Sequence, residues 1–203
     1  MVRHCCSVLA GRGYRSVVTS ALSPREQQGF LDDGFAVHEE LHLLAHDMGD
    51  LPEPPTLPNG VRLRRGHRWD RSQTLDVDGT AFPPFWRLDA SGLEEALAAT
   101  PQARYRIAAG RDVAGYAVTG RAGSRGYLQR LAVTPDASGR GLGTALVVDA
   151  LRWMQASRVK RAVVNTQVAN ERALGLYLHL GFRLQLSGLA VLTRPLADHQ
   201  PAR

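Results

Sequence analysis

The stretch from Tyr127 to Ala150 constrains the fold more than any other part of the chain. It opens with an apolar run over residues 131–133 that stops at a Thr-Pro pair, which is typical of a strand ending in a turn. Glycines then occupy positions 139, 141 and 143, and an almost wholly apolar segment long enough for a helix follows. This order predicts a strand, a glycine-rich loop and a buried helix.

A loop of this kind can hold an anion. The first backbone N–H groups of a helix have no partner within the helix and lie at the positive end of its dipole. Glycines let a phosphate approach the backbone closely. Two nucleotide-binding patterns do not fit, because Gly139-x-Gly141 is followed by Thr144 instead of the last glycine of G-x-G-x-x-G, and the Gly-Lys-Ser/Thr of a P-loop is absent. A glycine-rich turn without a ligand stays an alternative.

A second motif lies downstream, where residues 170–182 read N-x-x-A-x-x-L-Y-x-x-L-G-F. The two motifs together resemble the GNAT superfamily of acyl-CoA-dependent N-acyltransferases, whose pyrophosphate loop is Arg/Gln-x-x-Gly-x-Gly/Ala after a strand carrying V-x-P. Residues 138–143, SGRGLG, fit that loop except at the first position, where Ser138 replaces Arg or Gln. The resemblance covers about Val61 to Leu196.

The resemblance implies an α/β (α+β) fold with a mixed central β-sheet flanked by helices, and acetyl-CoA (coenzyme A) as cofactor. It places Tyr177 where the family often keeps a proton donor for the leaving thiolate, and Asn170 where the pantetheine arm is often contacted. The residues alone also allow a core tyrosine on an apolar helix face and a helix cap. The other cofactor-binding positions are Leu131, Ala132, Val133, Ser138, Gly139, Arg140, Gly141, Leu142, Gly143 and Thr144.

The implied reaction is direct attack of a primary amine on a thioester, and the amine must be neutral. Deprotonating a lysine of pKa ~10.4 at pH 7 costs about 4.6 kcal/mol, whereas an α-amino group costs about 1 kcal/mol. The oxyanion needs a donor, which the GNAT pattern places at the main-chain N–H near Leu131. No general base is evident, because Gln129 and Arg130 stand where some relatives carry a glutamate. His67, His179 and a chain of water molecules are the alternatives.

The leading interpretation is an N-acetyltransferase acting on a small-molecule or protein amine. A non-catalytic regulatory module that binds acyl-CoA is the alternative, because of Ser138 and the missing base. The acceptor stays open between a protein lysine, an N-terminus, a polyamine and an antibiotic amine. A toxin-like or nucleic-acid-modifying acetyltransferase is permitted by the basic charge.

Composition narrows the setting of the protein. The net charge is +6 and the sequence pI about 10.0, but the arginines are dispersed, so we expect no nucleic-acid partner. No apolar run approaches the ~20 residues that span a bilayer, so we expect no membrane association. The two cysteines are adjacent, at Cys5-Cys6, and encode no disulfide framework, which favours a cytoplasmic location.

Residues 1–50 resemble the second half of the GNAT pattern. At an offset of 147 positions (181 − 34 = 147), the aligned pairs are Gly34-Phe35 with Gly181-Phe182, Val17 with Val164, Thr19 with Thr166 and Phe30 with Tyr177. We infer a degenerate copy of that half, a β-α-β-β extension without the glycine loop, with chance similarity as the alternative. Such an arm buries too little to fold alone, so we expect it to dock on the GNAT domain or on a second chain in a homodimer.

The arm also contains His38-Glu39-Glu40-Leu41-His42, which fits the H-E-x-x-H pattern of zinc proteases. The repeat places this stretch on strands, where the two histidines lose the shared helical face, so we expect no metal site. The predicted organisation is an arm at 1–50, a proline-rich linker at 51–60, the GNAT acetyltransferase domain at 61–196 and a tail at 197–203.

Patterns within residues 61–196 predict the individual elements. Residues 91–100 form a helix capped by Ser91, residues 69–81 are ambiguous, and the aromatic residues of the stretch 82–86 line an acceptor pocket or plug a loop. The remaining expected elements are strands at 61–65, 103–109, 113–121, 161–167, 182–186 and 189–196, a helix at 141–157, and a helix begun by Asn170 and ended by Gly181.

Overall fold

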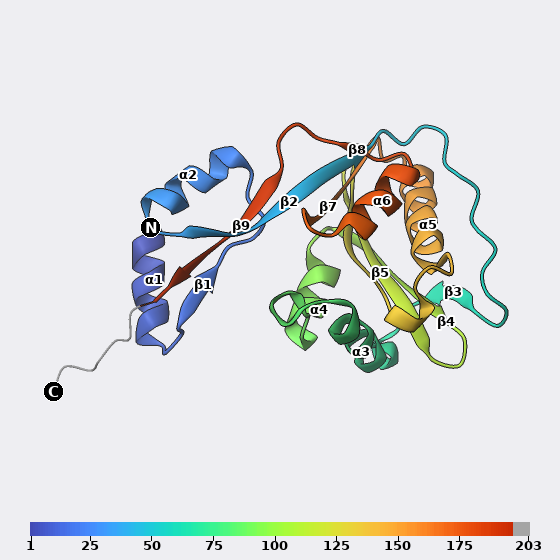
Figure 1. Ribbon diagram of the computed structural model, residues 1–203, viewed down its shortest axis with the longest axis horizontal. Helices are drawn as coiled ribbons and strands as arrows, with labels where there is room; N and C mark the ends of the chain where they lie inside the picture. The colour runs from blue at the N-terminus through green and yellow to red at the C-terminus, as the bar shows by residue number, and fades with distance from the viewer. Residues whose placement is uncertain (197–203) are drawn as a thin grey trace. The chain divides into compact units, whose positions relative to one another are not determined.

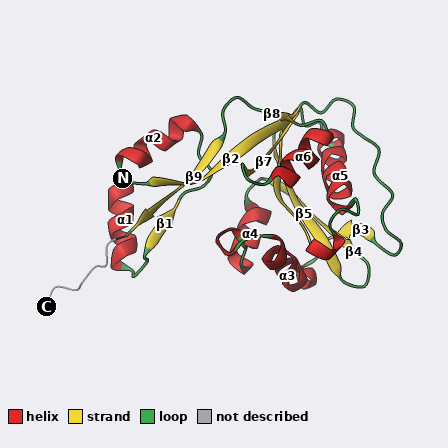
Figure 2. Ribbon diagram, in the orientation of Figure 1, coloured by secondary structure: helices red, strands yellow, loops and turns green. Residues whose placement is uncertain are grey.

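The computed structural model describes residues 1–196, so the predicted tail at 197–203 lies outside the described residues (Figures 1 and 2). The helices are α1 (Val2–Gly11), α2 (Pro24–Asp32), α3 (Arg71–Ala81), α4 (Ala90–Ala98), α5 (Leu142–Ala156) and α6 (Glu171–His179), with 3-10 turns η1 (Arg68–Asp70), η2 (Pro84–Trp86) and η3 (Pro135–Ala137). The strands are β1 (Ser16–Val18), β2 (Ala36–His46), β3 (Arg62–Arg65), β4 (Gln102–Ala109), β5 (Val113–Ala122), β6 (Arg125–Val133), β7 (Arg161–Gln167), β8 (Arg183–Leu184) and β9 (Leu189–Pro195).

The strands form one mixed sheet in the order β1-β9-β2-β7-β6-β5-β4-β3, and β8 pairs with β2. Strands β3 to β6 are antiparallel neighbours, and short hairpin turns join β4 to β5 and β5 to β6. Strands β6 and β7 are parallel and are joined through α5. The predicted mixed sheet flanked by helices is therefore confirmed. Among the described residues, none of the helices combines the length and the apolar character needed to span a membrane.

The chain divides into two compact units. Within the described residues, the first contains 1–44, 165–174 and 184–196, and the second contains Ala45–Val164 and Gly175–Arg183. Residues far apart in sequence thus share the first unit. The division differs from the linear segments expected from sequence, which stay a prediction about domain organisation.

In the second unit, strand alternation sorts the side chains onto two faces. On one face, Ile107 of β4 belongs to a buried cluster with Val77 of α3. On the other face, Arg104 and Arg106 of β4 bind Asp149 of α5 at 3.1 Å each. Helices α3 and α5 therefore cover opposite faces of the sheet, and on the α5 side Asp149 pairs with both arginines.

The segment preceding β3 lies along α5 within the same unit. Gln155 Nε2 donates to the carbonyl oxygen of Gly49 at 3.0 Å, and Arg152 Nη2 lies 3.0 Å from Glu53 Oε2. A Cβ atom added at Gly141 would lie 3.7 Å from Pro55. The proline-rich stretch is therefore held against the helix at several points, and it borders the glycine loop.

The first unit buries a small core of its own. Cys6 of α1 packs with Phe35, Ala190 and Leu192, and the partly buried Phe30 of α2 packs against this cluster. Cys5 is exposed, and both cysteines are free thiols. The two helices thus cover one face of β1 and β9.

The arm differs from the predicted β-α-β-β order at two places. A helix, α1, precedes β1, and residues 36–46 form the single strand β2 where two strands were expected. In the aligned second half, Gly188 stands in the turn between β8 and β9, but β2 contains no glycine or proline to interrupt it. The strand assignment of His38 and His42 is confirmed, and within residues 1–196 no group of three potential metal ligands gathers.

The structure settles one open stretch in the second unit and corrects one prediction. Residues 69–81, which the sequence pattern left ambiguous, form most of η1 and α3. The cap of α4 is Asp89 rather than Ser91, because the Asp89 carboxylate accepts the N–H of Gly92 at 2.8 Å. An aspartate two residues earlier supplies the same capping chemistry with a charge that suits the helix dipole.

Candidate functional site

The candidate site is built on β6, which separates from its neighbour β7 part-way along. The two strands pair in parallel only where Arg125–Tyr127 lies opposite Arg161–Val163. On its other side, β6 stays paired with β5 as far as Val133. Residues 128–133 therefore have one edge in the sheet, and no strand of the described chain pairs with their other edge.

One hydrogen bond fixes which backbone groups face that open edge. Thr134 N donates to the carbonyl oxygen of Ala114 at 2.9 Å, so the backbone groups of Thr134 point toward β5. Because direction alternates along a strand, Ala132 also points toward β5, whereas Leu131 and Val133 present N–H and C=O groups to the open edge. Of the three strand positions predicted to bind the cofactor, Leu131 and Val133 thus direct their backbone groups to the open edge. The third, Ala132, faces β5, and its side chain is buried in the core.

The loop after β6 turns on two glycines in the left-handed region. Gly139 has a φ of +75° and Gly141 a φ of +80°, where side chains with a Cβ are strained. Gly141 is the N-cap of α5, and the first hydrogen bond of the helix runs from Ala145 N to the Gly141 carbonyl oxygen at 2.9 Å. The N–H groups of residues 142–144 consequently have no partner within the helix.

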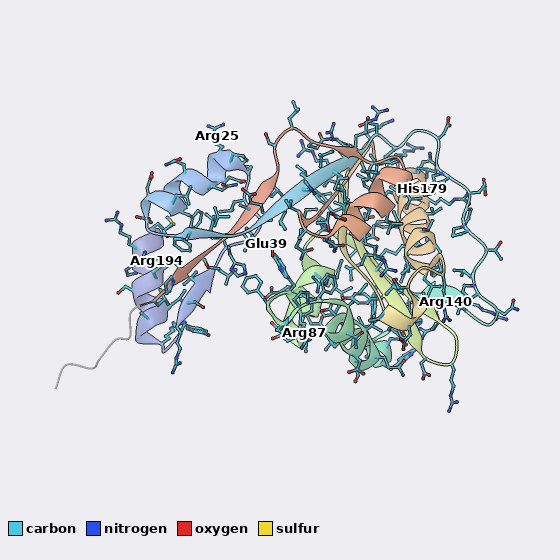
Figure 3. The ribbon with its side chains drawn as sticks, in the orientation of Figure 1. Arg25, Glu39, Arg87, Arg140, His179 and Arg194 are labelled. Carbon is cyan, nitrogen blue, oxygen red and sulfur yellow. The ribbon has the colours of Figure 1, made fainter. Side chains whose placement is uncertain are left out.

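The loop leaves these donors accessible. Gly139 and Arg140 are exposed, and Figure 3 marks Arg140 on the loop before α5. Leu142 is buried and anchors the start of the helix in the core. Ser138 stands where the family pattern has Arg or Gln, and its backbone N–H donates to the Pro135 carbonyl oxygen at 3.1 Å. Residues 138–144 therefore gather around one uncapped helix N-terminus, as the motif predicts.

A β-bulge shapes the middle of β6. Arg130 pairs with Val118 and Leu128 with Thr119, so Gln129 is an extra residue opposite no partner. The bulge sends two consecutive side chains to the same face. Gln129 Nε2 reaches Thr100 Oγ1 at 3.4 Å, and Arg130 reaches Asp78 of α3.

Asp78 is the centre of a saturated polar network that sequence reasoning missed. Its side chain is fully buried and accepts from Tyr116 Oη at 2.5 Å, from Leu88 N at 2.7 Å, and from Arg130 Nε and Nη2 at 2.8 and 2.9 Å. Four donors occupy this carboxylate, so it is not available as a general base. The sequence offers no signal for it, because α3 carries two aspartates, Asp76 and Asp78, and nothing local distinguishes them.

The same arginine holds the loop between α3 and α4. The Arg130 guanidinium stacks over the Phe82 ring at 3.6 Å and donates to the Trp86 carbonyl oxygen at 2.6 Å. Arg87, marked in Figure 3, donates to the Phe82 carbonyl oxygen at 3.0 Å. Phe82 therefore closes the loop against β6, whereas Phe85 is exposed. Arg130 thus ties this loop to the central strand.

Tyr177 lies in α6 with 5% of its surface exposed. Its ring centroid is 5.6 Å from that of Phe182. Burial raises the pKa of Tyr177, so the phenol is protonated at neutral pH, as a proton donor must be. No hydrogen bond ties down its hydroxyl within residues 1–196. His179, marked in Figure 3 on the same helix, is exposed.

Asn170 caps α6, since its Oδ1 accepts the N–H of Ala173 at 3.0 Å, and the predicted cap is confirmed. Asn170 belongs to the first unit and Tyr177 to the second, so the pantetheine contact of Asn170 stays a prediction. His67, the other titratable candidate, stacks on Trp69 with ring centroids 4.3 Å apart.

His46 is a buried histidine in the second unit, and it should make stability depend on pH. Its Nδ1 accepts the Met48 N–H at 2.9 Å, its ring contacts Phe182, and burial lowers its pKa. The unfolded chain then takes up the proton more readily below about pH 6.5, so stability should fall as pH falls, by at most about 1.4 kcal/mol per pH unit. Denaturant unfolding at about pH 7.5 and 5.5 would measure this.

The matched variant is His46→Asn, which keeps an acceptor for the Met48 N–H and removes the titration. Its unfolding free energy should lack this part of the pH dependence. An unchanged pH dependence in the variant would assign the effect to other groups.

Comparisons with known proteins agree with this geometry. The model of the acetyltransferase (GNAT) family matches residues 71–182. No curated protein matches the sequence. Among solved structures, a tandem GNAT protein from the clavulanic acid biosynthesis pathway is 15% identical with a TM-score of 0.69, covering 98% of this chain and 69% of that one.

Two further structures show the same fold. A GCN5-related N-acetyltransferase from Sphaerobacter thermophilus is 15% identical with a TM-score of 0.63, and the match covers 89% of this chain but only 60% of that one. A ribosomal-protein alanine N-acetyltransferase from Escherichia coli is 16% identical with a TM-score of 0.57, covering 70% of this chain and 99% of that one. The family model spans more than half of the sequence, and the chain belongs to the GNAT family of acetyltransferases.

Proposed function

We propose that the protein is an N-acetyltransferase that moves an acetyl group from acetyl-CoA to a primary amine. The observation that carries this proposal is the open edge of β6 leading directly into the uncapped N-terminus of α5. An unpaired strand edge offers hydrogen bonds to an amide-containing chain, and a helix N-terminus offers them to a pyrophosphate. In acetyl-CoA the amide-containing pantetheine arm is followed by the pyrophosphate, so its groups come in the same order as the strand edge and the helix N-terminus.

The residues present fit such a donor molecule. The N–H groups at the start of α5 would hold the pyrophosphate, with Gly139 and Gly141 leaving space for it. Leu131 and Val133 would bind the pantetheine arm through their backbone groups. Ser138 can contribute a hydroxyl but not the charge that Arg supplies in the family pattern.

The chemistry assigned to the side chains is limited and specific. The Leu131 N–H would donate to the acyl oxygen as negative charge develops there. The amine nitrogen forms a bond to the acyl carbon as the C–S bond breaks, and Tyr177 gives a proton to the leaving sulfur. The amine loses its proton to water. Asp78 cannot take this proton, because its carboxylate already accepts four hydrogen bonds.

The occupancy of Asp78 bears on the acceptor, because this carboxylate cannot take the proton of the amine. A lysine side chain would need about 4.6 kcal/mol to become neutral at pH 7, but an α-amine only about 1 kcal/mol. We therefore favour an α-amine of a peptide or small molecule over a lysine side chain. The structural similarity to a ribosomal-protein alanine N-acetyltransferase is in line with this preference.

The test is acetyl transfer measured as release of free thiol from acetyl-CoA with a panel of amines at pH 7. Peptides with a free N-terminus should be better acceptors than the same peptides with a blocked N-terminus and a free lysine. Turnover on lysine alone would contradict the acceptor assignment. Tight acetyl-CoA binding without turnover on any amine would instead support the regulatory module.

A further inference from the structure

The structure extends the internal repeat from a few aligned residues to matching local geometry. Helix α2, Pro24–Asp32, and helix α6, Glu171–His179, have the same bounds at the offset of 147 (171 − 24 = 147 and 179 − 32 = 147). The caps of both helices, Ser23 and Asn170, also align. Two helices that begin and end at equivalent residues indicate a true structural repeat.

The ends of these two helices are equally alike. Gly34 has a φ of +82° and Gly181 a φ of +86°. The following N–H of Phe35 bonds to the Phe30 carbonyl oxygen at 3.0 Å, and that of Phe182 bonds to the Tyr177 carbonyl oxygen at 3.0 Å. The ring centroids of Phe30 and Phe35 are 5.2 Å apart, and those of Tyr177 and Phe182 are 5.6 Å apart.

The repeat also includes the helix before β1, which corresponds to the end of α5. Tyr14 N bonds to the Leu9 carbonyl oxygen at 3.1 Å, and Val159 N bonds to the Met154 carbonyl oxygen at 3.0 Å. The residue before each donor, Gly13 or Arg158, has a positive φ. Leu9 and Tyr14 therefore correspond to Met154 and Val159, and β1 corresponds to β7.

The two copies differ at one edge. β7 is paired with β6, but β1 ends the sheet, and no strand within residues 1–196 lies on its outer side (Figure 1). Thr19 N bonds to Leu192 and Leu196 N to Arg15, so alternate residues of β1 face β9. The backbone groups of Ser16 and Val18 consequently point outward without a strand partner.

Apolar side chains accompany this edge. Met154 and Val159 are 1% and 3% exposed and pack against Gly126 of β6. Their counterparts lack such a cover, since Tyr14 is 59% exposed and Leu9 is half-buried. Val18 on β1 itself is 48% exposed. The arm thus shows apolar residues at positions that a β6-like strand covers in the other copy.

We propose that the edge surface formed by Leu9, Tyr14, Ser16 and Val18 binds a strand of a separate polypeptide, parallel to β1, as β6 lies beside β7. The partner is the first half of a GNAT domain, whose central strand carries apolar residues and a glycine at the position of Gly126. A second copy of this chain does not fit, because the part of its β6 that contains Gly126 is already paired with β7 on one side and with β5 on the other. A two-fold axis would also pair β1 with its mate antiparallel.

The probe is a synthetic peptide of residues 124–134, SRGYLQRLAVT, which reproduces β6, added to the full chain. Hydrogen exchange of the Ser16 and Val18 amides should slow by ~10-fold or more, because both gain acceptors. A scrambled peptide of the same composition should have no effect. Val18→Lys should abolish the protection, whereas Val37→Lys, a change at a residue also 48% exposed, should preserve it.

Three results would overturn the proposal. The first is an absence of protection at Ser16 and Val18 with the β6 peptide at millimolar concentration. The second is protection of the same amides without peptide in a chain that sediments as a dimer, which would identify a second copy as the occupant. The third is a loss of protection in Val37→Lys equal to that in Val18→Lys, which would show that the peptide does not bind at the edge of β1.

Discussion

Gly141→Asp should lower the affinity for coenzyme A by at least ~100-fold. The substitution places a carboxylate at the N-cap of α5, beside the N–H groups that would hold the pyrophosphate. Two like charges about 4 Å apart near a protein surface repel by up to about 4 kcal/mol, which is more than the predicted loss requires. Calorimetric titration with coenzyme A measures the effect directly.

Gly141→Asn is the matched control, because it has the shape of Asp without the charge. Both residues must adopt the left-handed φ of +80° at this position, and Asn and Asp tolerate that region better than other side chains. A Cβ atom here meets only Pro55, at ordinary contact distance. We expect the Asn variant to bind more tightly than the Asp variant. Equal affinities of the Asp variant and the parent chain would remove the pyrophosphate assignment.

Tyr177→Phe should reduce the rate of acetyl transfer by ~10²–10⁴-fold, the range typical of a general acid. The ring keeps its packing against Phe182, and the hydroxyl that is lost has no hydrogen-bond partner within residues 1–196. The unfolding free energy should therefore change little. Steady-state kinetics at saturating acetyl-CoA would separate the chemical step from binding.

Thermal unfolding of the same variant serves as its control. A slow variant with the melting temperature of the parent chain would support the assignment of Tyr177 as proton donor. Full turnover would return Tyr177 to a purely structural role in the core.

Local signals in the sequence predicted much of this fold correctly. The cap at Asn170 and the left-handed glycine at 181 depend on neighbouring residues alone, so they can be read from the chain. The same holds for the loop at residues 138–144, whose glycines are needed for its backbone conformation. The inferred repeat was suggested by matching residues, because equivalent turns need equivalent residues.

The rest depended on contacts between residues distant in sequence. Nothing near Asp78 shows that Arg130, 52 positions later, will share its carboxylate with Tyr116. Likewise, the separation of β6 from β7 follows from pairing across the sheet, not from either strand alone. Sequence therefore located the glycine loop before α5 but could not show that the Asp78 carboxylate is already occupied.

The bulge at Gln129 gives β6 one residue more than regular pairing with β5 would use. Because Gln129 and Arg130 share a face, deleting Gln129 would restore regular pairing and leave the flanking side chains on the faces that they already occupy. Deleting one of residues 131–133 would instead turn side chains on one side of the deletion to the opposite face of the sheet. In a deletion scan, position 129 should therefore be far more tolerant than positions 131–133. The bulge thus marks a place in the central strand where the length of the chain can vary.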